Sequence, residues 1–363
     1  MKQVFKASMG IPSSLPVRRA DTFTLRRGWI QWGWCVTGLA ALLAAPAVLP
    51  TFWLHIFNLA LIAVVGAVGL NLLTGNARLV SLGQAAFLGA GGFTAGLMTL
   101  KHTPPFLLVL LLAILVGCIL GFIVAIPSLR LRVLYVAVTT LALHFAVFLA
   151  LNMIQAYGLD SSGMVLPIPS IGNFELNSPV RWYYVLLLIS SGSVLIALNL
   201  LRSFVGRRWV AVADHDLAAE SLGIPVTRAK ISVFVISSGL GSLTGALLGY
   251  YLGTVTFEYY NLGLAITYLA MIIVGGIGRV LGSVFGAFFI TVVPYVLDRM
   301  LHLLNIGAEG STLSALHEVF YGALIVGFLL FEPRGLAEIW RRIKVAALDW
   351  PFRYRAAAQR FVK

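Results

Sequence analysis

Residues 202–230 read RSFVGRRWVAVADHDLAAESLGIPVTRAK, a charged segment that lies between two long apolar runs. Its ionisable side chains are Arg202, Arg207, Arg208, Asp214, Asp216, Glu220, Arg228 and Lys230. Each such charge costs about 2.5–3.5 kcal/mol at the centre of a bilayer, so burying all of them in lipid would cost about 20 kcal/mol or more. The segment is therefore expected to lie in water, between two helices that cross a membrane.

The rest of the chain has the composition of a membrane protein. Hydrophobic residues make up 60% of the 363 residues and charged residues 11%, whereas a soluble domain has about 25% charged residues. The net charge of +13 does not indicate nucleic-acid binding, because the positive residues lie between apolar runs and at the two ends. Cys35 and Cys118 both lie in apolar runs and predict neither a disulfide framework nor a cysteine metal site.

Ten apolar runs are long enough to cross about 30 Å of hydrocarbon. They are residues 33–50, 52–73, 80–100, 106–126, 133–152, 182–201, 231–252, 264–278, 280–297 and 317–331. The run 80–100 is rich in glycine and the run 264–278 is short, so each is a candidate for a broken or re-entrant helix. The sequence predicts an all-α polytopic membrane protein, with basic tails at 1–32 and 332–363 and a membrane domain at 33–331.

The distribution of positive charge predicts the orientation. If the amino end is cytoplasmic and every run crosses once, only Lys101, Arg181 and Arg299 of the 26 lysines and arginines lie outside. This agrees with the positive-inside rule, so both termini and residues 202–230 are expected in the cytoplasm. The first run is interpreted as an uncleaved span, although Ala44 to Ala47 could pass for a signal-peptide cleavage site.

The run 71–96 has an unusual content of glycine and amide side chains. Its glycines recur every few residues and leave a strip of helix without side chains. One interpretation is close helix packing. The other is an interrupted helix that lines a translocation path, with candidate residues Asn71, Gln84, Gly89 and Gly92. His144, in another span, is a further candidate for that path, although polar groups in spans usually bond neighbouring helices.

Two turns between apolar runs are weakly similar. Residues 75–87 read GNARLVSLGQAAF and residues 276–288 read GIGRVLGSVFGAF, each with arginine at the fourth position, Arg78 and Arg279. Transporters are often built from internal repeats. A true repeat and a chance similarity both remain open at the level of sequence.

No motif for catalysis or nucleotide binding is found in the chain. The sequence lacks a phosphate-binding loop, a His-Glu-x-x-His motif and a Gly-x-Ser-x-Gly motif, so it predicts no catalytic residue, metal ligand or cofactor. No Asp, Glu, Lys or Arg falls at the centre of a span, whereas ion-coupled carriers commonly need buried ionisable groups. Energy for any transport is therefore expected from a partner.

The charged segment itself predicts one short surface helix. Residues 209–222 lack Pro and Gly, and they are followed by Gly223, which favours a helix end, and Pro225, which favours the start of the next helix. Val210, Ala213 and Leu217 recur at helical spacing and would form its apolar stripe.

This surface helix has features that suit docking to a protein. Small side chains at Ala218 and Ala219 would let a partner close around Glu220, and Asp216 and Glu220 lie one turn apart. A helix held only by lipid is the alternative. Docking to protein is favoured, because the apolar stripe is narrow and the charges are mixed.

Several blocks together resemble the permeases of binding-protein-dependent ABC importers, specifically the LivM-type subunit of branched-chain amino acid uptake systems. The resemblance covers roughly residues 50–340 and is carried by residues 70–75 (LNLLTG), 81–87 (SLGQAAF), 130–135 (RLRVLY), 218–228 (AAESLGIPVTR), 274–278 (VGGIG) with Gly282, and 332–335 (EPRG). It implies a subunit that translocates Leu, Ile or Val. It also implies a LivH-like second permease, two cytoplasmic ATPases that use ATP and Mg²⁺, and a periplasmic binding protein as partners.

The resemblance also implies a cytoplasmic coupling helix that docks on an ATPase. This role maps onto Asp216, Ala218, Ala219, Glu220 and Gly223. The chain departs from the family pattern at Asn76 and Ala77 and at residues 160–163 (DSSG), which leaves urea, amides and aromatic acids open as substrates. An ion-driven secondary carrier and a membrane scaffold without transport activity are the other functional hypotheses.

Overall fold

The computed structural model describes residues 42–101, 104–129, 133–158, 163–172 and 174–303, together with residues 319, 322, 323, 327 and 335–340. The chain forms two compact units, Met1–Val48 and Leu49–Lys363. In the first unit, the described residues 42–48 are helical. The tail 1–32, most of the expected spans at 33–50 and 317–331, and most of the tail 332–363 lie outside the described residues.

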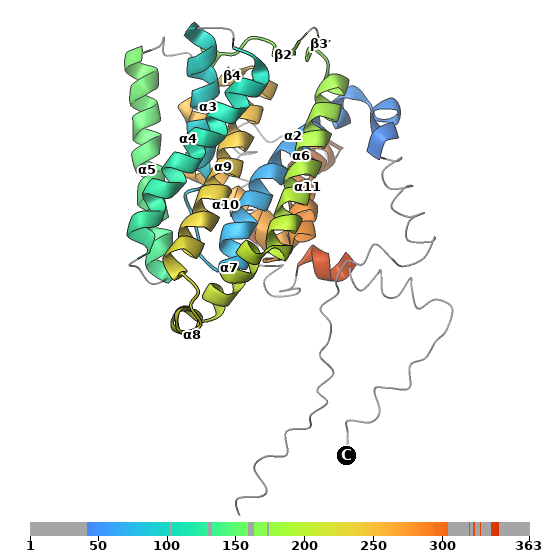
Figure 1. The fold of residues 1–363 in the computed structure, drawn as a ribbon. Helices are drawn as coiled ribbons and strands as arrows, with labels where there is room; N and C mark the ends of the chain where they lie inside the picture. Colours follow the sequence, from blue (N-terminus) through green and yellow to red (C-terminus); the bar gives the residue numbers. More distant parts are fainter. Residues whose placement is uncertain are drawn as a thin grey trace, which may run out of the picture. The chain divides into compact units, whose positions relative to one another are not determined.

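The second unit consists mainly of helices (Figure 1). The membrane-domain helices are α2 (Thr51–Asn71), α3 (Gln84–Lys101), α4 (Phe106–Ser128), α5 (Val133–Gly158), α6 (Pro179–Arg202), α9 (Val226–Leu252), α10 (Leu262–Gly275) and α11 (Val280–Leu303). A π-helical turn, η1 (Leu72–Asn76), extends α2, and a 3₁₀ turn, η2 (Phe257–Tyr260), precedes α10. Between α6 and α9 lie α7 (Phe204–Asp214) and α8 (Asp216–Ser221).

Four two-residue strands form two short antiparallel pairs. The strand β1 (Met164–Val165) pairs with β4 (Thr254–Val255), and β2 (Ser170–Ile171) pairs with β3 (Phe174–Glu175). In register, Met164 lies opposite Val255 and Ser170 lies opposite Glu175. The first pair joins the segments that follow α5 and α9, so these two helices end on the same side of the unit.

The predicted interior spans are all helical within residues 49–303. Five of the described helices are long and apolar enough to cross a membrane: α2 with η1, α4, α5, α6 and α9. The run 80–100, a candidate for a broken helix, forms the continuous helix α3, and the irregular backbone precedes it at residues 77–83. Helix α10 has 14 residues, about 21 Å at 1.5 Å per residue, and is too short to span the hydrocarbon by itself.

Helix contacts define two ends of this unit. At one end, His55 Nδ1 near the start of α2 lies 2.8 Å from the hydroxyl of Tyr251 near the end of α9, so α2 and α9 are antiparallel. At the other end, α2 and α10 both finish, because Asn71 Oδ1 accepts a hydrogen bond from the Gly278 amide at 2.8 Å. We call this second end, which carries Arg78, α7, α8 and Arg279, the basic end.

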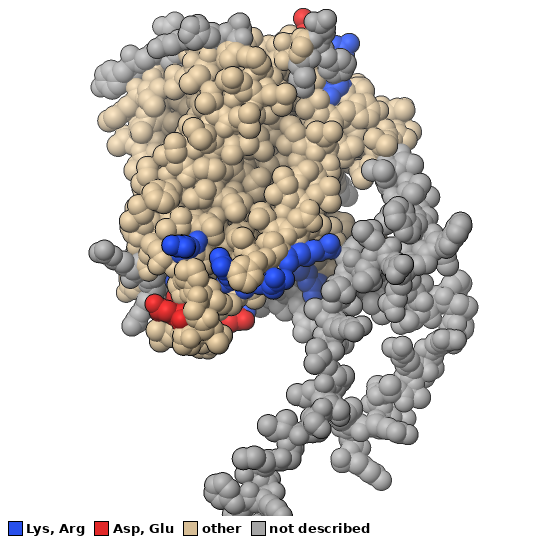
Figure 2. All heavy atoms as spheres, viewed as in Figure 1, with Lys and Arg blue, Asp and Glu red and all other residues tan. Residues whose placement is uncertain are grey.

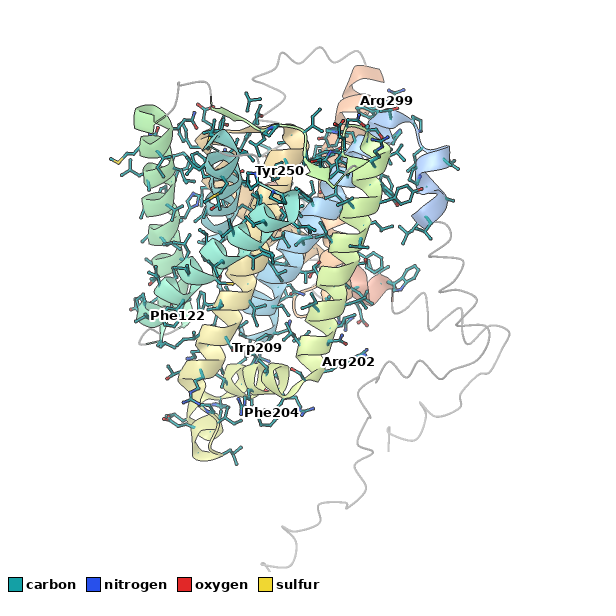
Figure 3. The ribbon with its side chains drawn as sticks, turned by 45° about the horizontal axis from the view of Figure 1, so that its top comes forward. Phe122, Arg202, Phe204, Trp209, Tyr250 and Arg299 are labelled. Carbon is teal, nitrogen blue, oxygen red and sulfur yellow. The ribbon has the colours of Figure 1, made fainter. Side chains whose placement is uncertain are left out.

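The charged side chains agree with these two ends. Figure 2 shows Lys and Arg in a band at the level of α7, with Asp and Glu beyond it over α8, and a broad uncharged surface above. Arg202 and Arg299 lie at opposite ends (Figure 3). This is the separation that the charge distribution predicts, and the side of the membrane that the basic end faces stays a prediction.

Small residues allow the central helices to pack closely. Gly91 of α3 faces the Ser242 backbone and Gly245 of α9 faces the Leu88 backbone, so a Cβ at either glycine would overlap a carbonyl group. The hydroxyls of α9 bond to two further helices: Ser242 Oγ donates to the Ala113 carbonyl of α4 at 2.6 Å and Ser237 Oγ to the Gly69 carbonyl of α2 at 2.7 Å. The structure therefore favours close packing as the role of the glycine-rich strip.

Candidate functional site

The first part of the charged segment, α7, is held against the membrane domain by one face. Ser203 caps the helix by accepting a hydrogen bond from the Val205 amide at 3.2 Å. Trp209 is 1% exposed, and its Nε1 donates to Ser232 Oγ of α9 at 2.8 Å. The buried residues of α7 are Gly206, Trp209 and Val212. The predicted apolar stripe of Val210, Ala213 and Leu217 is wrong, because Leu217 lies on α8 and the other two lie on α7.

The prediction of one helix over residues 209–222 is also wrong. His215 is extended, with φ −157° and ψ 107°, and separates α7 from α8. The two acids beside this break bind different partners: Asp214 Oδ1 lies 3.0 Å from Arg78 Nη1, and Asp216 Oδ2 lies 2.5 Å from Lys230 Nζ. In one continuous helix the side chains of Asp214 and Asp216 would point about 200° apart. The break at His215 changes the direction of the Asp216 side chain.

The second part of the segment, α8, is largely exposed. Asp216 lies in its first turn, where a carboxylate interacts favourably with the helix dipole. Asp216, Ala218, Glu220 and Gly223 of the five coupling candidates are exposed, whereas Ala219 is buried and 3% exposed. The side chain of Ala219 is therefore inaccessible, unlike the other four positions.

The end of α8 has the geometry that the sequence predicts. Gly223 has φ +78°, a left-handed conformation that favours glycine. Its amide donates to the Glu220 carbonyl at 2.9 Å, and the Ile224 amide donates to the Ala219 carbonyl at 3.0 Å. Pro225 then directly precedes α9, so the end of α8 is joined to a long membrane helix by a short rigid connection.

Apolar side chains complete the exposed surface of α8. Leu217 is 83% exposed and Leu222 is 80% exposed. Together with Glu220 they form what we call the α8 surface: Leu217, Ala218, Glu220 and Leu222. The two exposed leucines give this surface apolar contacts beside the charge of Glu220.

The two similar Gly-Arg turns lie against each other at the basic end. Gly278 donates its amide to Asn71 Oδ1, and Gly75 approaches the Gly278 backbone so closely that a Cβ would overlap it. Arg78 of the first turn forms an ion pair with Asp214 of α7. Arg279 of the second turn forms an ion pair with Glu338, in which Nη1 lies 2.9 Å from Oε2, and Glu338 is 1% exposed.

The roles of these ionic contacts were missed by reasoning from the sequence. Arg78 and Arg279 were noted only as topology determinants and as members of a weak repeat, and Asp214 and Glu338 were not candidates. The similarity of the two turns was the one signal that could have found them. Their contact does not test whether the similarity is a true repeat.

The candidates for a translocation path lie at separate contacts. Asn71 is a fully buried link between α2 and the α10–α11 turn. Gln84 is buried beside Gly241 of α9, and its Nε2 donates to the Gly66 carbonyl of α2 at 3.1 Å. Within the described residues, Asn71 Nδ2 and Gln84 Oε1 are buried without a hydrogen-bond partner.

The remaining path candidates line the contacts of α3 and α5. Gly89 and Gly92 both face Tyr260 of η2, whose ring also packs edge-on against Phe93 at 6.4 Å. His144 is buried, its ring centroid lies 6.1 Å from that of Phe148, and its Nδ1 has no partner among the described residues. The structure does not bring these residues together with Asn71 into one site.

No group of three or more His, Cys, Asp or Glu that could hold a metal ion occurs among the described residues. The site is thus a set of packed connections, in which α7 is tied to α9 and Arg78 and α8 is joined to the start of α9. Such an arrangement can transmit a displacement of α8 to the membrane helices.

Comparison with known proteins adds a family match. The family described as "Branched-chain amino acid transport system / permease component" matches residues 52–329. The LivM permease proteins of high-affinity branched-chain amino acid transport systems from Salmonella typhimurium and Escherichia coli are 28% and 27% identical over 310 residues, 79% of this chain and 70% of theirs. The autoinducer 2 import system permease protein LsrC of Yersinia pseudotuberculosis is 26% identical over 300 residues, 80% of this chain and 79% of that protein. No solved structure matches the chain.

Proposed function

We propose, from the premise that this chain belongs to the family of branched-chain amino acid transport system permease components, that it is the membrane-spanning subunit of an ATP-driven importer. The observation that carries the proposal is the exposed α8 surface at the basic end, joined at its base to the membrane helices. In this proposal α8 is the coupling helix, and an ATPase subunit covers it. The chain itself is a transport subunit with no catalytic role, and its family and apolar helices are those of a multi-pass inner-membrane protein.

The connections of the charged segment support coupling of this kind. A force on α8 reaches α9 through the short link Gly223–Pro225 and through the Asp216–Lys230 ion pair. It reaches the end of α2 through Asp214 and Arg78. From there, the contact of Asn71 with Gly278 leads to α10 and α11.

The charged groups of α8 favour a basic partner surface. Asp216 and Glu220 are exposed at positions one turn apart, although Asp216 is already paired with Lys230. Glu220 is therefore the acid most available to a partner, with Leu217 and Leu222 beside it as apolar contacts. Such a combination suits a groove with an apolar floor and a cation at its rim.

The proposed assembly has several members beyond this chain. We propose a LivH-like second permease, two cytoplasmic ATPases that use ATP and Mg²⁺, and a periplasmic binding protein that delivers the substrate. The basic end and both termini would then face the cytoplasm, as the positive-inside rule predicts. Because no Asp, Glu, Lys or Arg lies at the centre of a described span, an external source of energy fits the chain better than ion coupling.

The proposed substrates are the branched-chain amino acids Leu, Ile and Val. The names of the LivM relatives support this choice, and the LsrC name shows that a permease of similar identity serves an autoinducer 2 import system. Urea, amides and aromatic acids therefore stay as alternative cargo for the same architecture. An ion-coupled secondary carrier is the alternative mechanism.

Uptake of labelled leucine by vesicles that contain the reconstituted chain and its partner subunits tests the proposal. Uptake should require ATP and the ATPases and should persist when ionophores collapse the ion gradients. Uptake that continues without the ATPases would overturn the mechanism. Competition by unlabelled isoleucine, urea or phenylalanine in the same assay identifies the cargo, since only a branched-chain competitor should lower leucine uptake.

A further inference from the structure

Three arginines gather where α6 meets α7. Arg202 is in the last turn of α6, and Arg207 and Arg208 are in the first two turns of α7. Arg207 Nη1 donates to the Arg202 carbonyl at 3.2 Å. Of the residues that the structure describes, no carboxylate lies within ion-pair distance of these three guanidinium groups. The cluster thus concentrates positive charge that the described part of the chain leaves unneutralised.

An exposed aromatic ring belongs to the same cluster. Phe204 is 58% exposed, and Arg208 Cζ lies 4.1 Å from the centre of its ring, with Arg207 Cζ at 5.9 Å. Figure 3 labels Arg202 near the end of α6 and Phe204 below α7. Stacking on the ring holds the Arg208 guanidinium in place while its edge stays able to bind a ligand. We call Arg202, Phe204, Arg207 and Arg208 the arginine cluster.

The arginine cluster lies at the boundary between apolar and polar surface. Above it, α6 exposes Leu188, Leu195 and Ile196. In Figure 2 the Lys and Arg side chains form a band along the lower edge of the uncharged surface, and the acidic side chains lie beyond them. A membrane that covers the apolar surface places the cluster at the depth of the lipid headgroups.

We propose that the arginine cluster binds the phosphate of an anionic glycerophospholipid, such as phosphatidylglycerol, in the leaflet at the basic end. Guanidinium groups bind phosphate oxygens through paired, charge-assisted hydrogen bonds. Phe204 contributes an aromatic ring at the headgroup level, and the exposed leucine and isoleucine side chains of α6 lie where the acyl chains run. The bound lipid anchors α7, while α8 beyond His215 stays available to a protein.

Charge complementarity favours a lipid over a protein at this cluster. The acids nearest to it in sequence, Asp214 and Asp216, are engaged by Arg78 and Lys230, so they do not neutralise the arginines. The acidic residues of α8 lie farther from the apolar surface than the arginines do (Figure 2). This arrangement places positive charge against an anionic leaflet and negative charge away from it.

Lipid selectivity of the full chain tests the proposal. The chain is reconstituted in phosphatidylcholine vesicles, and its association with spin-labelled phosphatidylglycerol is compared with that of spin-labelled phosphatidylcholine. The wild type should prefer phosphatidylglycerol. The double variant Arg207→Gln/Arg208→Gln should lower that preference at least fivefold, because one arginine near the surface contributes a factor of about five.

A matched variant separates the cluster from general charge. Arg228→Gln/Arg299→Gln removes the same charge from exposed positions outside the cluster and should keep the wild-type preference. If the first double variant does not fold, Arg207→Gln alone should fold, because the only described hydrogen bond of Arg207 is to a backbone carbonyl. It should lower the preference for phosphatidylglycerol by a smaller factor than the double variant. Thermal unfolding of each variant verifies the fold.

Four results would overturn the proposal. The first is a wild type without preference for phosphatidylglycerol, and the second is an equal loss in both double variants, which would indicate general charge alone. The third is displacement of the labelled lipid by inorganic phosphate far beyond chloride at equal ionic strength, which would indicate a site for free phosphate. If Arg207→Gln/Arg208→Gln keeps its lipid preference and loses ATPase binding in phosphatidylcholine vesicles, the cluster is a protein contact.

Discussion

Helices α7 and α8 are consecutive parts of one charged segment, and they face opposite surroundings. Helix α7 buries Gly206, Trp209 and Val212 against the membrane domain, whereas α8 buries only Ala219 of its six residues. Arg207 and Arg208 belong to the start of α7, and the acids Asp216 and Glu220 belong to α8. The difference shows that a single extended residue, His215, divides the segment into an anchored half and a half that is open to a partner.

The break at His215 assigns the two alternative interpretations of the segment to different helices. A lipid-held helix and a protein-docking helix were competing interpretations of residues 209–222 as one element. With the break at His215, the amphipathic and basic part is α7 and the short acidic part is α8.

The largest effect is expected at the buried face of α7. Trp209→Ala removes a side chain that is 1% exposed and its hydrogen bond to Ser232, and should lower the free energy of unfolding by about 3–5 kcal/mol. Leu217→Ala on α8 should change it by less than about 0.5 kcal/mol. Denaturant unfolding of both variants in detergent gives the measurement, and equal losses would erase the contrast between the two helices.

The exposed charge of α8 should govern coupling with little effect on folding. Glu220→Arg places a cation where the proposed partner surface is basic, and should lower ATP-driven leucine uptake at least tenfold, since like charges at an interface cost several kcal/mol. Glu258→Arg makes the same charge reversal at an exposed position of η2 and should leave uptake near the wild-type rate. Normal uptake in Glu220→Arg, at an unchanged amount in the membrane, would exclude Glu220 from coupling.

The end of α8 should respond through its backbone. Gly223 has φ +78° and nothing within 4 Å of the position of a Cβ, so Gly223→Ala adds strain without a clash, about 1 kcal/mol. Hydrogen exchange of the Ile224 amide, which bonds the Ala219 carbonyl, should become about fivefold faster. Gly223→Asn should exchange more slowly than Gly223→Ala, because asparagine tolerates this conformation; the opposite order would show that strain is not the cause.

The positions of the interior membrane helices could be predicted from sequence because the bilayer imposes a length and an apolar composition that few other folds meet. The helix end at Gly223 could also be predicted, because it depends on the conformation of one residue. The break at His215 was not predictable in this way. The acids on its two sides, Asp214 and Asp216, pair with Arg78 and Lys230, which lie far from each other in the sequence.

The path candidates illustrate the same distinction between local and distant determinants. Asn71 was singled out as a polar group that could meet a substrate, yet its Oδ1 binds the Gly278 amide, 207 residues away. The glycines of α3 were read correctly as a strip without side chains, but their neighbours, Tyr260 and the backbone of α9, came only from the structure. Sequence identifies unusual residues, and tertiary contacts decide what they serve.

The smallest effect is expected at the ion pair that joins α7 to the end of α2. Arg78 and Asp214 are 3.0 Å apart with side chains 65% and 58% exposed, so the pair should contribute about 0.2–1 kcal/mol to stability. If this pair transmits the motion of the segment, Arg78→Asp and Asp214→Arg should each lower ATP-driven uptake several-fold. The free energy of unfolding should change much less, because the exposed pair contributes only about 0.2–1 kcal/mol. The double exchange should then restore part of the uptake, because the attraction returns with its sign reversed at each residue. A double-mutant cycle on uptake measures this coupling, and additive losses would mean that Arg78 and Asp214 act independently, leaving the Gly223–Pro225 link and the Asp216–Lys230 pair as the connections from α8 to the spans.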